Sequence, residues 1–232
     1  MKIGVIVAME KELRQLRQLF NGGNVRVEKC GIGKVNAALG AQRMINEFHP
    51  DCIISSGCAG GNGDDVNVQD VVVSTDLCYH DVYCGNAAGG TVYGQVQGLP
   101  ARFTAAPDLL SKALNLSSLL PPDSSIKIHP GLIVTGDWFV DSKEKMREIL
   151  QHFPNARAVD MESAAIAHTC LLNKVRFISF RVISDIPLRD TDASQYHNFW
   201  DTVANKSFQV TKTFVESLSS LPGQPTAPYN YF

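Results

Sequence analysis

The chain has 232 residues, of which 44% are hydrophobic and 19% are charged, and a chain of this size and composition can bury a core of its own. Its formal net charge at pH 7 is −2, so no broad positive field favours nucleic acid or an anionic membrane surface as a partner. No apolar run approaches the length of a membrane span. The charged residues Glu10, Lys11 and Glu12 directly follow the apolar N-terminus, which is unlike a secretion signal. We therefore expect a cytoplasmic protein.

The cysteines give no sign of disulfides or of a metal site. None forms a C-x-x-C pair, and neither cysteine nor histidine clusters at the spacing of zinc ligands. Most of the cysteines lie in apolar stretches, so we expect buried, reduced thiols. These residues are Cys30, Cys52, Cys58, Cys78, Cys84 and Cys170.

The first quarter of the chain alternates apolar and amphipathic segments. A continuous apolar run predicts a buried strand over Lys2–Ala8, and leucines at helical spacing predict a helix over Glu10–Phe20. A short strand is expected over Val25–Lys29. The glycine-containing turn Gly31–Lys34 then leads into an amphipathic helix over Val35–Phe48.

The middle of the chain contains two more apolar strands and one irregular segment. The strands are predicted over Cys52–Ser56, which ends in a glycine turn over Gly57–Gly61, and over Asp70–Leu77. The segment Tyr79–Phe103 is rich in Gly and Tyr and lacks periodicity, which indicates either a long loop with edge strands or a lid. A helix is expected over Pro107–Leu120.

The last part of the chain repeats the alternation. A strand is predicted over Ile126–Val134, and Ser142 can cap a helix that continues to Leu150. A short apolar piece and a small-residue helix make up Ala158–Cys170. A strongly apolar strand over Val175–Ile183 precedes a long helix over Gln195–Leu221.

This alternation predicts an α/β fold with one twisted central sheet and helices on both faces. Neither an internal repeat nor a linker divides the sequence, so residues 1–232 are expected to form a single domain. The tail, residues 222–232, carries three prolines and three aromatic residues. It is expected either to be flexible or to pack on a partner.

Polar side chains gather at the ends of the predicted strands. Because ligands collect at the carboxyl ends of strands in open α/β sheets, these ends form a candidate site. Acids from three separate strand ends come with a glycine turn, an aromatic side chain and an arginine. The residues are Met9, Glu12, Gly57–Gly61, Phe139, Val140, Asp160, Met161, Glu162, Arg181, Ser184 and Asp185.

Two interpretations fit Asp160 and Glu162, which precede the small-residue helix. Acids at a helix start are favoured by the unpaired N–H groups and the helix dipole, so capping alone would explain them. Alternatively, a carboxylate held there by a close-packed helix can face a cleft and accept hydrogen bonds from two vicinal hydroxyls.

Short motifs then follow one another along the chain: Val7–Glu12, Gly31–Val35, Ser56–Gly61, Thr135–Asp137, Val159–Glu162 and Arg181–Asp185. Together, and over about residues 1–221, they resemble the 5′-methylthioadenosine/S-adenosylhomocysteine nucleosidases of the nucleoside phosphorylase superfamily. The resemblance implies a three-layer αβα fold around a mixed sheet. It also implies hydrolysis of the N-glycosidic bond of 5′-thio-substituted adenosines with release of adenine, a place in methionine salvage, a homodimer, and neither a cofactor nor a metal.

The resemblance also assigns roles to the charged residues. Bond cleavage builds oxocarbenium charge on the ribose and negative charge on the base, so it needs an acid, a base and a grip on the sugar. By position, Asp185 would protonate adenine at N7, which requires a raised pKa that burial could give. Glu12 would activate the water with Arg181 nearby, and Glu162 would hold the ribose hydroxyls with Met161 packed on the sugar.

The remaining roles concern the base and the walls of the site. Phe139 would stack on the purine, the backbone of Val140 would read the adenine edge, and Tyr196 would close over the ribose. The resemblance adds to the substrate site Met9, Cys58, Ala59, Gly60 and Ser184. Without it, Asp185 is equally well a turn residue, Glu12 a solvated helix residue and Arg181 a partner in a strand-end salt bridge.

Departures from the family pattern leave other functions open. Cys58 stands where the family usually has a serine, and Pro187–Arg189 replaces a family motif. One alternative is a nucleosidase for another 5′-modified nucleoside, such as a futalosine-type compound, and another is a non-catalytic nucleoside-binding module. A purine nucleoside phosphorylase is disfavoured because no arginine stands beside the Gly57 turn to grip phosphate.

Overall fold

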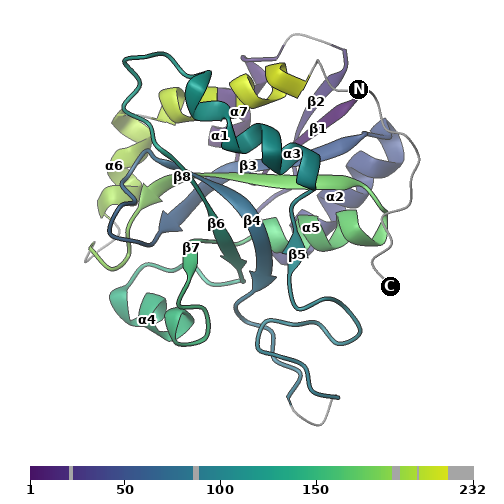
Figure 1. Ribbon diagram of the computed structural model, residues 1–232, viewed down its shortest axis with the longest axis vertical. Coiled ribbons are helices and arrows are strands. Elements are labelled where there is room, and N and C mark those ends of the chain that lie inside the picture. Colours follow the sequence, from purple (N-terminus) through teal and green to yellow (C-terminus); the bar gives the residue numbers. More distant parts are fainter. Residues whose placement is uncertain (21–22, 86–88, 190–193, 203, 219–232) are drawn as a thin grey trace.

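The computed structural model describes residues 1–20, 23–85, 89–189, 194–202 and 204–218. Its centre is an eight-stranded sheet (Figure 1). The strands are β1 (Ile3–Val7), β2 (Val25–Lys29), β3 (Cys52–Gly61), β4 (Val71–Tyr79), β5 (Phe103–Thr104), β6 (Ile128–Thr135), β7 (Ala156–Asp160) and β8 (Arg176–Asp185). The helices are α1 (Glu10–Arg17), α2 (Lys34–Phe48), α3 (Pro107–Leu114), the 3-10 turn η2 (Leu116–Ser118), α4 (Lys143–His152), α5 (Ser163–Leu172), α6 (Ser194–Thr202) and α7 (Ala204–Ser217).

The sheet is mixed, as the resemblance implied. Its strand order is β2-β1-β3-β7-β6-β4-β5, and β8 pairs with both β3 and β4. β3 runs parallel to β1 and β8 but antiparallel to β7, whereas β8 runs antiparallel to β4. Through their pairings, β3, β8, β4, β6 and β7 close into a ring of strands. Residues far apart in the sequence therefore meet at the ends of these strands.

Helices cover both faces of the sheet. Successive side chains of a strand point to opposite faces, and β1 illustrates the consequence. Val5 and Val7 belong to a core cluster with residues of α1, α3 and α7, whereas Ile6 packs in a second cluster with residues of α2 and α5. The predicted three-layer αβα arrangement is confirmed.

The glycine turn predicted over Gly57–Gly61 is wrong, because β3 continues to Gly61. These glycines allow close packing within the strand rather than a change of direction. A Cβ on Gly57 would lie 2.2 Å from Arg181 Nη1, and one on Gly61 would lie 2.7 Å from Ile183 Cγ2. The strand therefore brings its backbone, and not a loop, to the candidate site.

The described part of the irregular segment Tyr79–Phe103 forms a loop with an edge strand. Its described residues 80–85 and 89–102 form turns and irregular backbone, and the short β5 at its end pairs with β4 at the sheet edge. The predicted helix Pro107–Leu120 divides into α3 and η2.

The predicted helix Gln195–Leu221 is helical in α6 and α7, on either side of residue 203. Residue 203, residues 219–221 and the tail, residues 222–232, lie outside the described part of the chain. The other predicted helices and strands agree with the observed bounds to within three residues. All six cysteines are free, and Cys52, Cys78 and Cys170 are buried.

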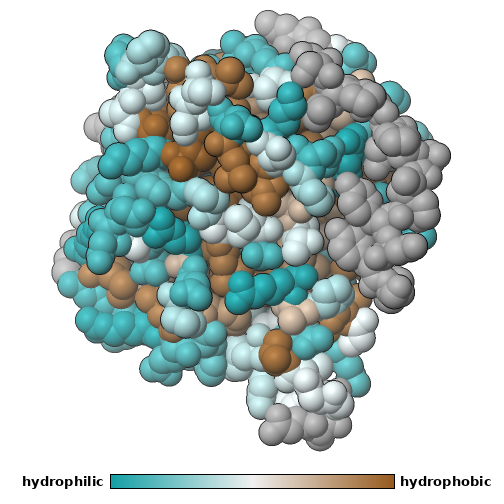
Figure 2. All heavy atoms as spheres, in the orientation of Figure 1, coloured by the Kyte–Doolittle hydropathy of each residue, from teal (hydrophilic) through white to brown (hydrophobic). Residues whose placement is uncertain are grey.

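The face seen in Figure 2 is mostly hydrophilic, and its hydrophobic areas are interrupted by polar side chains. This pattern agrees with the balanced composition of the chain. Across the ranges that the structure describes, no helix is both long enough and apolar enough to cross a membrane.

Candidate active site

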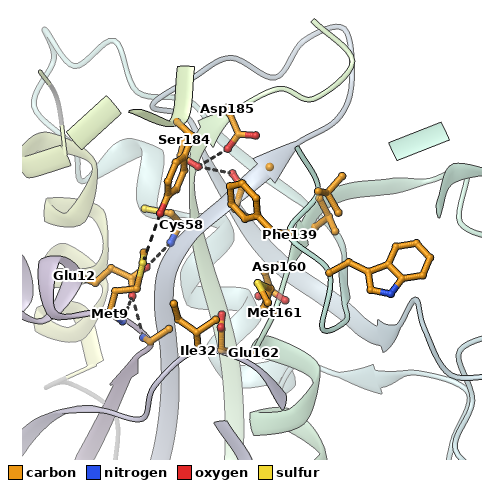
Figure 3. A pocket seen from close by; sticks show the side chains of 17 residues that line it. Met9, Glu12, Ile32, Cys58, Phe139, Asp160, Met161, Glu162, Ser184 and Asp185 are labelled. Carbon is orange, nitrogen blue, oxygen red and sulfur yellow. Dashed lines mark hydrogen bonds between the residues drawn. The ribbon is translucent and has the colours of Figure 1, made fainter. Parts of the chain in front are cut away.

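Most of the predicted site residues surround one cavity at the ends of β1, β6, β7 and β8 and along β3 (Figure 3). Its volume, counting the opening to solvent, is about 610 Å³, within the range of small-molecule sites. The cavity is lined by Ala8, Met9, Glu12, Ile32, Cys58, Ala59, Gly60, Trp138, Phe139, Val140, Val159, Asp160, Met161, Glu162, Ser184, Asp185 and Tyr196. In Figure 3, Glu12 lies to the left, Asp185 toward the top and Glu162 below.

Glu12 is a buried carboxylate that accepts hydrogen bonds from three backbone amides. It lies in the first turn of α1, which begins soon after β1 ends, and its side chain turns back toward the strand. Oε2 accepts hydrogen bonds from the amides of Ala8 and Met9, each at 2.9 Å, and Oε1 accepts one from Cys58 N at 2.9 Å. Burial raises the pKa of Glu12, whereas the charge of Arg181 and these amides oppose the rise. A carboxylate with raised proton affinity at a cavity wall is suited to act as a general base.

Asp160, rather than Glu162, caps α5. Ser163 N lies 3.3 and 3.2 Å from the two carboxylate oxygens of Asp160, and the Thr135 hydroxyl also donates to Asp160. Glu162 occupies the N-cap position but makes no capping hydrogen bond through its side chain. Of the two interpretations of this acidic pair, capping therefore applies to Asp160, and Glu162 is left to face the cavity.

Glu162 is held by a residue from the start of α2. Its Oε1 accepts a hydrogen bond from Gly33 N at 3.0 Å, and its Oε2 lies 3.7 Å from Arg181 Nη2. Burial raises the pKa of Glu162 from 4.5 to about 7, although the charge of Arg181 opposes the rise. Its carboxylate can accept hydrogen bonds from hydroxyl groups of a ligand.

Arg181 was predicted as a catalytic residue but does not line the cavity, and neither do Gly57 and Gly61 of the predicted site. The side chain of Arg181 is 1% exposed and forms an ion pair with Asp160. Nε also donates to Ser163 Oγ, and Nη2 donates to Ser55 Oγ, both at 3.0 Å. These bonds hold the guanidinium behind Glu12 and Glu162, outside the cavity. Burial alone would lower its pKa, but the carboxylates of Asp160, Glu162 and Glu12 raise it, so Arg181 stays cationic.

Asp185 ends β8 on another side of the cavity. Its Oδ1 accepts a hydrogen bond from the Ser184 hydroxyl at 2.6 Å, and that hydroxyl lies 3.3 Å from the carbonyl oxygen of Ala59. A register shift between Ala59 and Gly60 aligns Gly60 with Asp185. Asp185 is buried except for 7% of its surface, so a ligand in the cavity would meet it away from bulk water.

Aromatic and sulfur-containing side chains cover part of the opening. The rings of Phe139 and Tyr196 meet edge to face with centroids 5.4 Å apart, and Tyr196 Oη donates to Met9 Sδ at 3.7 Å. Phe139 is 49% exposed, whereas Val140 is buried. This group joins α6, the β6–α4 connection and the start of α1.

Cys58 also lines the cavity. Burial raises the pKa of its thiol well above 9.0, and the nearby carboxylate of Glu12 adds to the rise. The side chain is therefore a neutral thiol, which is a weak hydrogen-bond donor.

Sequence reasoning did not select four lining residues. Ala8, Ile32 and Val159 lie inside motifs that carried the family resemblance, and Trp138 adjoins Phe139, which was selected. Membership of those motifs was the available signal. Within the described ranges, no group of three or more His, Cys, Asp or Glu side chains is arranged to hold a metal ion.

Known proteins resemble this chain over nearly its whole length. The model of the phosphorylase superfamily matches residues 2–216. A 5′-methylthioadenosine/S-adenosylhomocysteine nucleosidase of Exiguobacterium sp. is 38% identical over 94% of this chain and 99% of its own. The corresponding nucleosidase of Staphylococcus epidermidis is 35% identical over 93% of this chain and 100% of its own.

Solved structures agree with these sequence matches. The nucleosidase of Colwellia psychrerythraea in complex with adenine superposes with a TM-score of 0.86 at 33% identity, covering 94% of this chain and 96% of its own. The nucleosidase of Neisseria meningitidis in complex with methylthio-immucillin-A gives a TM-score of 0.84 at 36% identity, covering 94% of this chain and 99% of its own.

Proposed function

This chain belongs to the phosphorylase superfamily and, within it, to the 5′-methylthioadenosine/S-adenosylhomocysteine nucleosidases. We propose that it hydrolyses the N-glycosidic bond of methylthioadenosine and of S-adenosylhomocysteine and so releases adenine. One observation carries this proposal: the carboxyl groups of Glu12, Glu162 and Asp185 line a single cavity. Cleavage of the bond needs a proton donor for the base, a group that activates water and a grip on the sugar.

Each carboxyl group has a distinct proposed task. Asp185 donates a proton to N7 of adenine, so that the base leaves as a neutral molecule. Glu12 accepts a proton from the attacking water, a role that its raised pKa and its fixed position support. Glu162 accepts hydrogen bonds from the ribose hydroxyls, and Met161 packs on the sugar. The oxocarbenium charge that develops on the ribose is stabilised by the neighbouring carboxylates.

The walls of the cavity support recognition of a purine. The aromatic ring of Phe139 stacks on the base, and the backbone of Val140 reads its edge. Tyr196 closes over the ribose together with Met9. Arg181 acts as a positioning residue: its charge lies behind Glu12 and Glu162 rather than in the cavity, and it favours their ionised forms.

Hydrolysis is favoured over phosphorolysis by the charge of the lining. Phosphate sites in proteins depend on arginine, lysine or other cationic donors. The cavity residues described above include Glu12, Asp160, Glu162 and Asp185 but neither arginine nor lysine. A phosphate ion would meet carboxylates there, whereas a neutral water molecule would not be repelled.

We further infer that the chain acts as a single nucleosidase domain, residues 1–232, in the cytoplasm, and that it forms a homodimer. Val35 and Leu39 of α2 are 71% and 66% exposed, and Leu172 of the neighbouring α5 is 62% exposed. Apolar side chains gathered on adjacent helices favour contact with a second copy. Sedimentation of the wild type and of Leu39→Glu would test this: the variant is expected to sediment as a monomer, and an unchanged dimer would contradict this interface.

Chromatography of free base tests the activity directly. The protein is incubated with methylthioadenosine, S-adenosylhomocysteine, adenosine and a futalosine-type nucleoside, each with and without phosphate. We expect rapid adenine release from the two thio-substituted compounds at a rate that does not depend on phosphate, which would fit a role in methionine salvage. Formation of a sugar 1-phosphate would instead indicate a phosphorylase. Preference for the futalosine-type compound would indicate a nucleosidase for another substrate, and binding without cleavage would indicate a non-catalytic module.

A further inference from the structure

The N-terminus of α2 lacks a capping side chain of its own. Its N-cap residue is Gly33, with φ of 92°, and the first turn of the helix contains no acidic residue. Nevertheless, two successive amides at this end bind carboxylates from distant parts of the chain. Gly33 N donates to Glu162 Oε1 at 3.0 Å, and Lys34 N donates to Asp137 Oδ1 at 2.9 Å. The helix end therefore connects Glu162 in the cavity with Asp137 in the β6–α4 connection.

A second set of bonds fixes Asp137 in turn. Asp81, just after β4, accepts hydrogen bonds at Oδ2 from Asp137 N at 2.9 Å and from Lys34 Nζ at 2.7 Å. Lys34 Nζ also lies 3.6 Å from Asp137 Oδ2. The side chains of Asp81 and Lys34 are 10% and 24% exposed, which limits screening of their charges by solvent. We call this set of three residues the Asp81–Lys34–Asp137 clamp.

Space around Gly33 shows how closely the clamp approaches the helix end. A Cβ on Gly33 would lie 3.0 Å from Asp137 Oδ1, so the peptide that carries the Gly33 amide is confined against Asp137. The second oxygen of the Glu162 carboxylate, Oε2, lies 3.7 Å from Arg181 Nη2. Gly33 N therefore provides the short hydrogen bond that orients Glu162.

We propose that Asp137 is a positioning residue for Glu162: through Lys34 and Gly33, the clamp holds the carboxylate in the orientation that accepts the ribose hydroxyls. The proposal rests on the role of Glu162 in the proposed function. Loss of the clamp would let the start of α2 move, and a small displacement of an oriented group is enough to reduce a rate substantially. The loss should be confined to substrates that present hydroxyls to Glu162.

A pair of substrates tests this dependence. Asp137→Ala is expected to lower kcat/KM for methylthioadenosine about tenfold. For the 2′,3′-dideoxy analogue, which offers Glu162 no hydroxyl, the decrease should be less than about twofold. Asp137→Asn keeps an acceptor for Lys34 N and should recover activity to within about threefold of the wild type. Asp141→Ala is the matched control, because Asp141 lies in the same connection but pairs with Lys145 at the surface. Equal losses on both substrates would overturn the proposal.

Amide hydrogen exchange provides a measurement that does not depend on activity. The amides of Gly33 and Lys34 should exchange at least tenfold faster in Asp137→Ala than in the wild type, and at an unchanged rate in Asp141→Ala. Unchanged exchange in Asp137→Ala would overturn the clamp. If Asp137→Ala fails to fold, Lys34→Met serves as a second variant, because it removes the ammonium group but keeps the backbone amide. Its kcat/KM should also fall more for methylthioadenosine than for the dideoxy analogue, but by a smaller factor than in Asp137→Ala. If the wild type releases no adenine, the proposed function fails while exchange still decides whether the clamp exists.

Discussion

Arg181 and Asp160 form an ion pair in which each side chain is 1% exposed, at the wall of the candidate active site. The pair joins β8 to the end of β7, and Asp160 at the same time caps α5. One buried contact thus fixes the two elements that carry Asp185 and Glu162. Its main role is to hold the acids of the site in place, since Arg181 itself does not reach the cavity.

Replacement of Arg181 by Met should therefore destabilise the fold strongly. The substitution leaves Asp160 buried without its partner, and the loss of one member of a buried pair costs about 3–5 kcal/mol of unfolding free energy. Urea denaturation followed by circular dichroism measures the change. Arg147→Ala serves as a control, because Arg147 and Glu144 are 63% and 78% exposed and an exposed pair contributes less than about 1 kcal/mol. Similar stabilities for the two variants would contradict the assigned role.

Asp185→Asn and Glu12→Gln should abolish most of the activity. Each substitution keeps the shape of the side chain but removes the ability to transfer a proton, which typically contributes about 100-fold or more to the rate. Adenine release under single-turnover conditions gives the chemical step for each variant. Asp64→Asn, at an exposed position outside the cavity lining, should retain wild-type activity. If Asp185→Asn or Glu12→Gln released adenine at the wild-type rate, its assigned role would be wrong.

Local patterns predicted most of the elements but not the function of each acid. A continuous apolar run predicted β1, and leucines at helical spacing predicted α1. Each signal lies within a few residues of sequence, so both elements were predictable. Asp160 and Glu162 are two residues apart and equally acidic. Their different roles depend on Thr135, Arg181 and Gly33, which come from other elements.

Strand pairing also explains what sequence patterns missed. The glycines at the end of β3 are typical of a turn, yet they are strand residues because Arg181 and Ile183 pack against them from β8. No short window of sequence contains both partners of such a contact. The position of Arg181 behind the cavity follows from the same pairing.

Stability should depend on pH through Glu162. Burial raises its pKa from 4.5 to about 7, so the folded chain binds this proton more tightly than the unfolded chain does. Its contribution to the free energy of unfolding is then fully present below about pH 4.5 and is lost as the pH rises through about 7. Relative to Glu162→Gln, which does not titrate, the wild type should gain about 2 kcal/mol between pH 8 and pH 5.

Urea denaturation of both proteins across this pH range measures the difference. Glu148→Gln, at an exposed position on α4, should follow the wild type at every pH. A difference between the wild type and Glu162→Gln that stays constant from pH 8 to pH 5 would show that Glu162 does not titrate with a raised pKa.

Gly57→Ala tests how closely the acids of the site pack on the backbone of β3. The added Cβ would lie 2.2 Å from Arg181 Nη1 and 2.8 Å from Glu12 Oε1. Arg181 cannot move aside freely, because Asp160, Ser163 and Ser55 hold its guanidinium. The overpacked variant should lose about 1–3 kcal/mol of unfolding free energy. It should also release adenine more slowly, since Glu12 is displaced.

Gly23→Ala is the matched control for this substitution. A Cβ on Gly23 meets no atom within 4 Å. The unfolding free energy of Gly23→Ala should therefore stay within about 0.5 kcal/mol of the wild-type value. Thermal unfolding and adenine release of the two alanine variants can be measured side by side. Because both substitutions add the same methyl group, any difference between them reports the surroundings of the glycine. Equal behaviour would mean that Gly57 does not pack against Arg181 and Glu12, and the arrangement of these two residues behind and within the cavity would then be wrong.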